Sequence, residues 1–316
     1  MKQKVSKRNY YNNSFFLRLY ADMKRNYILY LMILPVVAYY IIFAYVPMYG
    51  VQLAFKDYIA RKGIWGSPFV GLEHFKRFFD NYNFALLIKN TIGISLYSLL
   101  VGFPIPIIFS LMLNYLKYEK LKKTVQMVSY APYFISTVVM CGMLIIFLQS
   151  DTGIFNTLGG MFGLDSVDFL SRPKLFKSIY VWSGVWQGLG WSSIIYISAL
   201  SGVDYQLHEA AIVDGATKLQ RIWHVDLPSI KPTIVMLLIL NMGQIMNVGF
   251  DKVFLLQNSL NFKASDVIST YVYRVGLINN DYGYSTAVGL FNSVINLFLV
   301  VSANKIAKKL TSESLW

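Results

Sequence analysis

The sequence is poor in charged residues, cysteine and histidine. Charged residues make up 14% of its 316 residues, whereas a soluble domain contains about 25%, which argues against a soluble enzyme. The single cysteine, Cys141, lies in an apolar run and excludes an intrachain disulfide. The three histidines (His74, His208 and His224) lie outside the long apolar runs, so we expect no metal site inside a membrane.

Two sequence motifs of nucleotide and metal chemistry are also missing. No Gly-x-x-x-x-Gly-Lys-Ser/Thr stretch occurs, so the chain is not expected to bind ATP through a phosphate loop. His208-Glu209 begins like a zinc-protease helix, but Ile212 stands where the second histidine is needed. We therefore expect a chain that is not an enzyme, with no catalytic residues, no metal and no cofactor of its own.

Long apolar runs are what the sequence has in abundance, since 55% of its residues are hydrophobic. A membrane core of roughly 30 Å needs about 20 apolar residues in a helix. Prolines in or beside these runs (Pro35, Pro104, Pro106, Pro132) predict kinks. We expect an all-α polytopic membrane protein whose six transmembrane helices are Tyr27–Val46, Leu86–Leu113, Val125–Leu148, Ser178–Leu200, Thr233–Phe250 and Tyr284–Ile306.

The distribution of Lys and Arg predicts the orientation of these spans. With the N-terminus inside, the inner segments carry 17 of these residues and the outer loops 11, so both termini are expected to be cytoplasmic. The net charge of +13 fits a bilayer with anionic lipid better than nucleic acid. Ahead of the first span, Phe15, Phe16, Leu19 and Tyr20 predict either an interfacial helix or, equally, a disordered basic arm.

One polar, small-residue segment between the fourth and fifth runs is unusual. It contains Glu209-Ala210-Ala211, then Asp214-Gly215-Ala216, then Val225-Asp226-Leu227-Pro228. Asp204 can cap a short helix that reaches Ala211, and Gly215 suits a turn with positive φ. A second helical piece over 217–224 is expected to end at Leu227-Pro228 and Pro232. Two short cytoplasmic helices with alanines at the elbow would fit a groove on a partner protein, although an ordinary inner loop is the alternative.

The spacing in this segment resembles the signature loop of ABC importer permeases, the inner membrane components of binding-protein-dependent transport systems. Glu-Ala-Ala, three residues, Gly, nine residues and then an aliphatic-x-Leu-Pro match at each defining position. Further segments are similar to the carbohydrate-type permeases, namely Phe250–Leu256, Tyr271–Arg274 and Ala287–Gly289. The resemblance is greatest to the permeases for polygalacturonan, alginate and complex glycans. The chain departs from the maltose type at Asn258–Asn261, where Gly-Gly-Pro is absent, and has no large outer insert.

The resemblance implies a domain organisation and a set of partners. Residues 1–26 would be a cytoplasmic arm, 27–85 the first span with an outer loop, 86–309 the permease core with a coupling loop at 203–228, and 310–316 a cytoplasmic tail. The chain would lie in a bacterial cell membrane as half of a pore. It would pair with a second homologous permease, two ATP-binding subunits that hold ATP and Mg, and an extracytoplasmic solute-binding protein that delivers an oligosaccharide.

The resemblance also implies roles in the coupling loop. Glu209 would be a charged contact, Ala210 and Ala211 the close-packing surface, and Gly215 the turn of a helix seated in the ATPase. The full set of coupling residues expected on this basis is Glu209, Ala210, Ala211, Asp214, Gly215, Ala216, Leu227 and Pro228.

A polar stripe in the fifth and sixth runs predicts a substrate path. At 100° per residue, Asn241, Gln244, Asn247 and Asp251 fall within an arc of about 120°, and Asn292 and Asn296 form an i, i+4 pair. Amides both donate and accept hydrogen bonds, which suits sugar hydroxyls. Hydrogen bonding between helices is an equally good explanation of these amides.

Three tryptophans and a glutamine lie in the outer half of the fourth run. Trp182 is expected to anchor the helix at the membrane interface. Trp186 and Gln187 are expected to line the path, and Trp191 lies near them.

Three alternatives to an oligosaccharide importer remain at this stage. The cargo could be a non-sugar solute. A secondary carrier is disfavoured because the spans hold almost no ionisable residues. A polytopic membrane enzyme would need paired carboxylates or a histidine at a membrane edge, and the sequence shows neither.

Overall fold

A computed structural model describes residues 15–311 of the chain. Within that range most of the backbone is helical, and the one β interaction is an isolated antiparallel bridge between Lys56 and Phe69. The all-α fold class predicted from the apolar runs is confirmed. Residues 1–14 of the expected arm (1–26) and residues 312–316 of the expected tail (310–316) lie outside the described residues.

The chain divides into two compact units at Gln52–Leu53. The first unit contains a helix over Phe15–Arg25, where an interfacial helix was one of two expectations. Its described helices are α1 (Phe15–Arg25), α2 (Tyr27–Tyr40), the π-helical η1 (Ile41–Tyr45) and α3 (Val46–Met48), followed by the 3₁₀ helix η2 (Tyr49–Phe55) at the boundary.

The second unit holds the remaining helices. The shorter ones are η3 (Ala60–Lys62), α4 (Gly63–Gly66), α5 (Glu73–Phe79), η4 (Ala131–Phe134), α10 (Ile154–Met161), α12 (Tyr205–Val213), α13 (Lys218–Arg221), η5 (Ile222–Asp226), α15 (Phe250–Leu256), α16 (Phe262–Ser265), α17 (Ile268–Tyr273) and η6 (Arg274–Ile278). The longer ones are α6 (Phe84–Gly102), α7 (Pro104–Asn114), α8 (Glu119–Tyr130), α9 (Thr137–Phe147), α11 (Pro173–Ser201), α14 (Leu227–Met242) and α18 (Tyr282–Thr311).

Several of these helices are long and apolar enough to cross a membrane. Four continuous stretches qualify by themselves, namely Tyr27–Phe55, Phe84–Asn114, Lys218–Met242 and Tyr282–Lys309. A fifth qualifies if the bent pair Glu119–Phe134 and Thr137–Phe147 counts as one span. Helix α11 has 29 residues but is not among them. The chain is thus a multi-pass membrane protein, and the count of six spans stays a prediction.

Two predicted spans are wrong in detail. The run Val125–Leu148 is not one helix, because the chain bends by 99° between η4 and α9. Pro132 lies in η4, and Ser136 caps the new helix by accepting a hydrogen bond from the Val139 N–H. The run Thr233–Phe250 is also not one helix, since α14 ends at Met242 and a non-helical stretch precedes α15.

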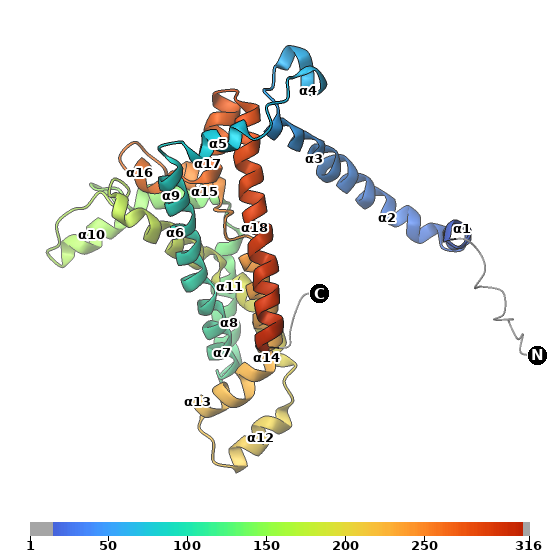
Figure 1. Ribbon diagram of the computed structural model, residues 1–316. Coiled ribbons are helices and arrows are strands. Elements are labelled where there is room, and N and C mark those ends of the chain that lie inside the picture. Colours follow the sequence, from blue (N-terminus) through green and yellow to red (C-terminus); the bar gives the residue numbers. More distant parts are fainter. Residues whose placement is uncertain (1–14, 312–316) are drawn as a thin grey trace, which may run out of the picture. The chain divides into compact units, whose positions relative to one another are not determined.

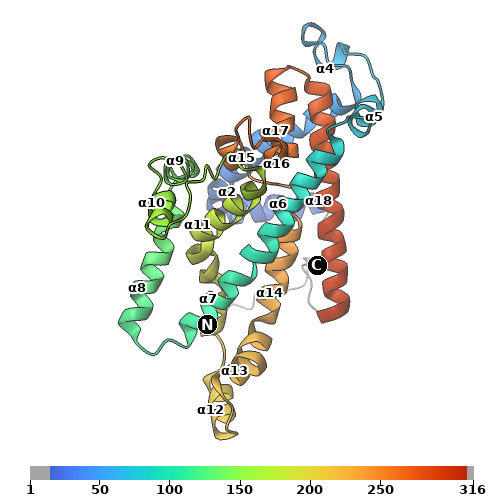
Figure 2. The ribbon, with the colours of Figure 1, turned by 90° about the vertical axis from the view of Figure 1, so that its left-hand side faces the viewer.

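Three apolar clusters hold the second unit together. One cluster joins α5, α6, α17 and α18 and includes Phe78 and Tyr284. A second joins α6, α9, α11 and α15, and the third joins α7, α11 and α14. Within this unit, α12 and α13 lie at one end, and α5 and α17 lie at the other (Figures 1 and 2). The polar segment at α12 is therefore far from the segments predicted to be extracytoplasmic.

Candidate functional site

The polar segment at residues 203–228, which we call the docking segment, begins as a well-capped helix. The Asp204 carboxylate accepts a hydrogen bond from the Gln206 N–H at 2.9 Å, so the predicted N-cap of α12 is confirmed. At its end Gly215 has φ +79°. The Gly215 and Ala216 N–H groups donate to the Ile212 and Ala211 carbonyls at 3.0 and 2.8 Å, which is the Schellman arrangement that favours glycine. The predicted turn is confirmed.

The second half of the docking segment differs from the prediction. Thr217 and Gln220 form a capping box that starts α13. The helix then continues through π-helical η5 into α14, so the predicted end at Leu227-Pro228 is wrong. Pro228 and Pro232 both lie within this continuous helix, Pro228 two residues after the π-helical turn and Pro232 about one turn further on. The docking segment is therefore continuous with a membrane helix.

A buried polar cluster connects α12 to the helices beside it. The Asp226 carboxylate is 0% exposed and accepts a hydrogen bond from the Tyr115 hydroxyl at 2.6 Å. His208 Nε2 lies 3.3 Å from the other carboxylate oxygen, an ion pair when the imidazole is protonated, without hydrogen-bond geometry. Burial and the contact with Asp226 raise the pKa of Tyr115 above its usual value. The sequence alone does not indicate this cluster, because His208 and Asp226 belong to no recognisable metal or catalytic motif.

The outer surface of the docking segment is apolar and open. Ile212 is 51% exposed, Val213 87%, Leu219 69% and Trp223 66%. Of the predicted coupling residues, Glu209, Ala210, Asp214 and Gly215 are exposed, whereas Ala211 and Ala216 are half-buried. Such a surface on a capped hairpin is typical of a site that another protein covers.

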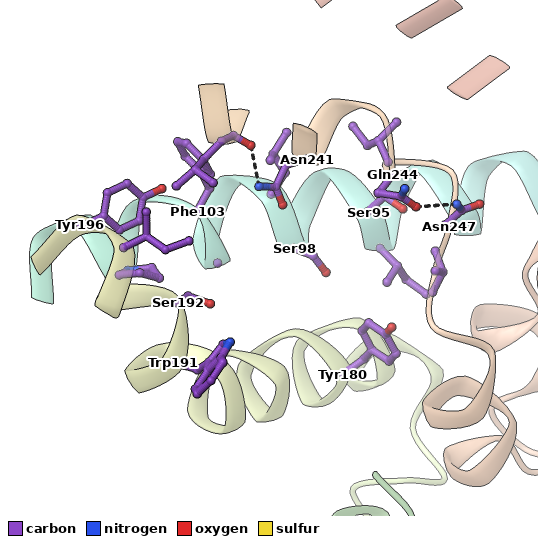
Figure 3. A pocket seen from close by; sticks show the side chains of 18 of the residues that line it. Ser95, Ser98, Phe103, Tyr180, Trp191, Ser192, Tyr196, Asn241, Gln244 and Asn247 are labelled. Carbon is purple, nitrogen blue, oxygen red and sulfur yellow. Dashed lines mark hydrogen bonds between the residues drawn. The ribbon is translucent and has the colours of Figure 1, made fainter. Parts of the chain in front are cut away.

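A cavity of about 620 Å³ lies between α6, α7, α11, α14 and the break after α14 (Figure 3). This volume is within the range of about 300 to 1,000 Å³ that small-molecule sites occupy. The lining of this cavity is mostly apolar, with hydroxyl and amide groups among its residues. The polar residues in this lining are Ser95, Ser98, Tyr180, Trp191, Ser192, Tyr196, Asn241, Gln244 and Asn247.

Most of the predicted amides come together, although not through one helical face. Asn247 Oδ1 accepts hydrogen bonds from Asn292 Nδ2 at 2.9 Å and from Asn296 Nδ2 at 3.1 Å. Asn247 Nδ2 donates to Gln244 Oε1 at 2.7 Å, as Figure 3 shows. Because α14 ends at Met242, the helical arc drawn through these positions is wrong. The break in the chain brings Asn247 to α18 instead, so Asn247 both lines the cavity and joins the break to α18, whereas Asn292 and Asn296 lie outside the lining.

The other predicted path residues lie elsewhere. Trp186 and Asp251 are exposed, and they line neither this cavity nor a second, smaller cavity beside it, which is described below. Gln187 lines the second cavity, and its side-chain amide donates a hydrogen bond to the Ile135 carbonyl at 2.7 Å. Trp182 Nε1 donates to the Tyr97 hydroxyl at 3.0 Å. Trp191, not Trp186, is the tryptophan of the cavity, where its ring stacks on Tyr133 with centroids 4.4 Å apart.

A second cavity of about 260 Å³ adjoins the first. The two share Ser98, Gly102, Pro106, Tyr180 and Ser192 in their walls. The second is also lined by Lys252, whose side chain is 8% exposed. Sequence reasoning missed the serines and Tyr180, since isolated hydroxyls in apolar runs give no periodic signal.

Comparison with known proteins finds a family model that covers the docking segment and the cavity helices α7, α11 and α14, but begins only at the end of α6. Residues 102–312 match the model described as "Binding-protein-dependent transport system inner membrane component". The polygalacturonan/rhamnogalacturonan transport system permease protein YteP of Bacillus subtilis is 42% identical over 95% of this chain and 93% of its own length. The LplB protein of the same organism is also 42% identical, over 94% of this chain and 93% of its own length.

Two solved structures of ABC transporters also contain chains that are similar to this one over nearly its whole length. A bacterial ABC transporter involved in the import of the acidic polysaccharide alginate has a chain that is 41% identical, with a TM-score of 0.86 over 93% of this chain and 99% of that one. A bacterial alginate ABC transporter in complex with an alginate pentasaccharide-bound periplasmic protein gives a TM-score of 0.87 over 94% and 100%, again with 41% identity.

Proposed function

The chain belongs to the family of binding-protein-dependent transport system inner membrane components, and from this membership we propose that it forms half of the translocation path of an ATP-driven oligosaccharide importer. It is a transport subunit. ATP and Mg would be held by partner subunits, and a second homologous permease would complete the path. An extracytoplasmic binding protein would deliver the cargo, since one structural relative was solved with such a protein.

The docking segment is the part of the chain that would couple transport to ATP hydrolysis. The observation that carries this proposal is the capped hairpin whose apolar side chains Ile212, Val213, Leu219 and Trp223 are exposed, because packing within this chain does not require such a surface. Val213 and Ile212 would enter a groove on the ATPase, with Glu209 as a charged contact at its edge and Ala210 allowing close approach. Asp226 and Tyr115 would transmit the movement of α12 to the spans.

The orientation follows from the same assignment. The docking segment would lie in the cytoplasm with both termini, as the distribution of Lys and Arg predicts. The outer segments around α5 and α17 would face the binding protein. The chain would alternate between states open to either side of a bacterial cell membrane.

Oligosaccharide is the cargo that the cavity suits best. Its hydroxyl and amide lining can exchange hydrogen bonds with sugar hydroxyls, and Trp191 offers a ring at its wall. Relatives are named for polygalacturonan and alginate. Gln244 and Asn247 would contact the sugar, and Asn292 and Asn296 would hold Asn247 in place.

Affinity purification from the native membrane, with mass spectrometry of the co-purifying chains, tests the proposal. We expect a second permease and an ATP-binding subunit. Replacing both Ile212 and Val213 with Asp should release the ATP-binding subunit, whereas Asp at Tyr82, which is 91% exposed at the other end of this unit, should not. A chain that purifies alone, or two variants that behave alike, would contradict the proposal.

A further inference from the structure

Lys252 is a buried cation in the wall of the second cavity. It is the third residue of α15 and is 8% exposed. Its Nζ donates a hydrogen bond to the Tyr180 carbonyl at 2.7 Å and lies 4.6 Å from the centre of the Tyr180 ring. A Cβ placed on Gly184 would come within 3.1 Å of the same Nζ. Tyr180 and Gly184 both line this cavity, so the ammonium group lies at its wall.

No carboxylate pairs with this ammonium group in the part of the chain that the structure describes. The ion pairs there use other cations, including Arg77 and Arg274. Neither cavity has Asp or Glu in its lining. Asp251 is next in sequence, but its side chain is exposed and makes no ion pair with Lys252. A buried charge without a partner is costly, and the Tyr180 carbonyl satisfies only one of the three ammonium N–H groups.

The two cavities therefore differ in chemistry while sharing a wall. The first offers neutral hydroxyls and amides, and the second adds a positive charge beside Ser98 and Tyr180. A further pair of lysines lies on α6 and α11 outside both linings, since Lys177 of α11 packs over Gly93 of α6 and is close enough to Lys89 of α6 for their charges to interact. Cations in a concave, low-dielectric wall concentrate anions there.

We propose that Lys252 recognises a carboxylate on the oligosaccharide in this cavity, and that it thereby selects acidic over neutral cargo. The inference rests on the proposed function, because it takes a sugar to be the cargo. The sugar's hydroxyls would contact the first cavity, and its carboxylate would enter the second and accept the two remaining N–H groups of Lys252. A charge-assisted hydrogen bond of this kind would supply the missing counter-charge.

Uptake by the assembled importer in proteoliposomes, with its binding protein and ATP, tests the inference. The probes are trigalacturonate and its methyl ester, which have the same sugar skeleton but differ in charge. Lys252→Gln should lower the uptake rate of trigalacturonate by about tenfold or more, because losing even one of the two hydrogen bonds to the carboxylate corresponds to such a factor. Its rate with the ester should stay within about twofold of wild type. Because the binding protein is unchanged, the shift in preference belongs to the permease.

Two further variants separate recognition from folding. Lys252→Arg keeps the charge and should keep the preference for trigalacturonate. Lys263→Gln removes an exposed lysine outside both linings and should change neither rate.

The outcomes distinguish this inference from the function on which it rests. If Lys252→Gln slows both probes equally, or neither, Lys252 is not a carboxylate contact and the inference is wrong, although oligosaccharide import stands. If the wild type takes up neutral oligosaccharides but not trigalacturonate, the same conclusion holds. If the wild type takes up no oligosaccharide at all, the proposed function falls and the inference falls with it.

Discussion

Gly215 offers a sharp test of whether the shape of the docking segment matters. Its φ of +79° lies in the left-handed region, and a Cβ there would meet no atom within 4 Å. A side chain at Gly215 therefore causes backbone strain without a steric clash. The left-handed conformation costs about 1 to 2 kcal/mol for an ordinary residue, and a β-branched residue is at the upper end.

Gly215→Val should thus disfavour the native elbow by about 2 kcal/mol, or about 30-fold. If docking on the ATPase needs this elbow, ATP-driven uptake in vesicles should fall by up to that factor, while the chain still accumulates in the membrane. Gly215→Asn should retain most of the uptake, because Asn tolerates the left-handed region better than other residues.

Gly163 supplies a matched control. It has φ +76° and equally open surroundings, but it follows α10, outside the docking segment. Gly163→Val carries the same backbone strain, and it should leave co-purification of the ATP-binding subunit unchanged. Normal uptake by Gly215→Val, or equal loss of the ATP-binding subunit from both valine variants, would refute the reasoning.

Three other substitutions test further contacts. Asp226→Ala removes the acceptor of the Tyr115 hydroxyl and should speed tryptic cleavage of the docking segment by about tenfold or more, since a hydrogen bond to a charged group contributes about 1.5 to 3 kcal/mol. An unchanged cleavage rate would show that this hydrogen bond does not hold the docking segment in place. Asn247→Ala removes the acceptor of the Asn292 and Asn296 amides, and each of these contacts contributes about 0.6 to 2 kcal/mol. This variant should weaken uptake or change substrate preference without loss of the partner subunits. Uptake that is unchanged for every substrate would make the amide network purely structural. Gly190→Val would push a side chain of α11 into the Ser129 carbonyl of α8, so the chain should fail to accumulate in the membrane. An immunoblot of the membranes measures this, and normal levels would mean that α8 can move away from α11.

Local signals in the sequence predicted local structure well. Asp204 and Gly215 each specify a helix end through their own backbone and side-chain preferences, and both ends form as expected. The apolar runs predicted helices, because long hydrophobic stretches have few alternatives in a membrane. The break after Met242 was missed, since Gln244 and Asn247 alternate with apolar residues that were assigned to the same helix, and Gly243 at its C-cap was not read as an end.

The site was harder to predict, because its residues come together through tertiary packing. Asn247 was predicted as a path residue on the assumption that the fifth helix continues to it, but that helix ends at Met242. Asn247 lies in the non-helical stretch that follows, where it accepts a hydrogen bond from Asn296. Ser98 and Tyr180 lie on different helices, and nothing local links them. Lys252 was noted in the sequence only as part of a family-like stretch, since the absence of a counter-charge is visible only in three dimensions.

Photo-crosslinking from Ala210 would test the central claim most directly. A benzophenone amino acid placed there, in native membranes, should yield an adduct whose partner is identified by mass spectrometry as an ATP-binding subunit. The same amino acid at Tyr82, which is exposed near α5 at the opposite end of its unit, should not yield it. An adduct with the ATP-binding subunit from Tyr82 but not from Ala210, or none from either position, would contradict the assignment of residues 203–228 as the segment that docks on the ATPase.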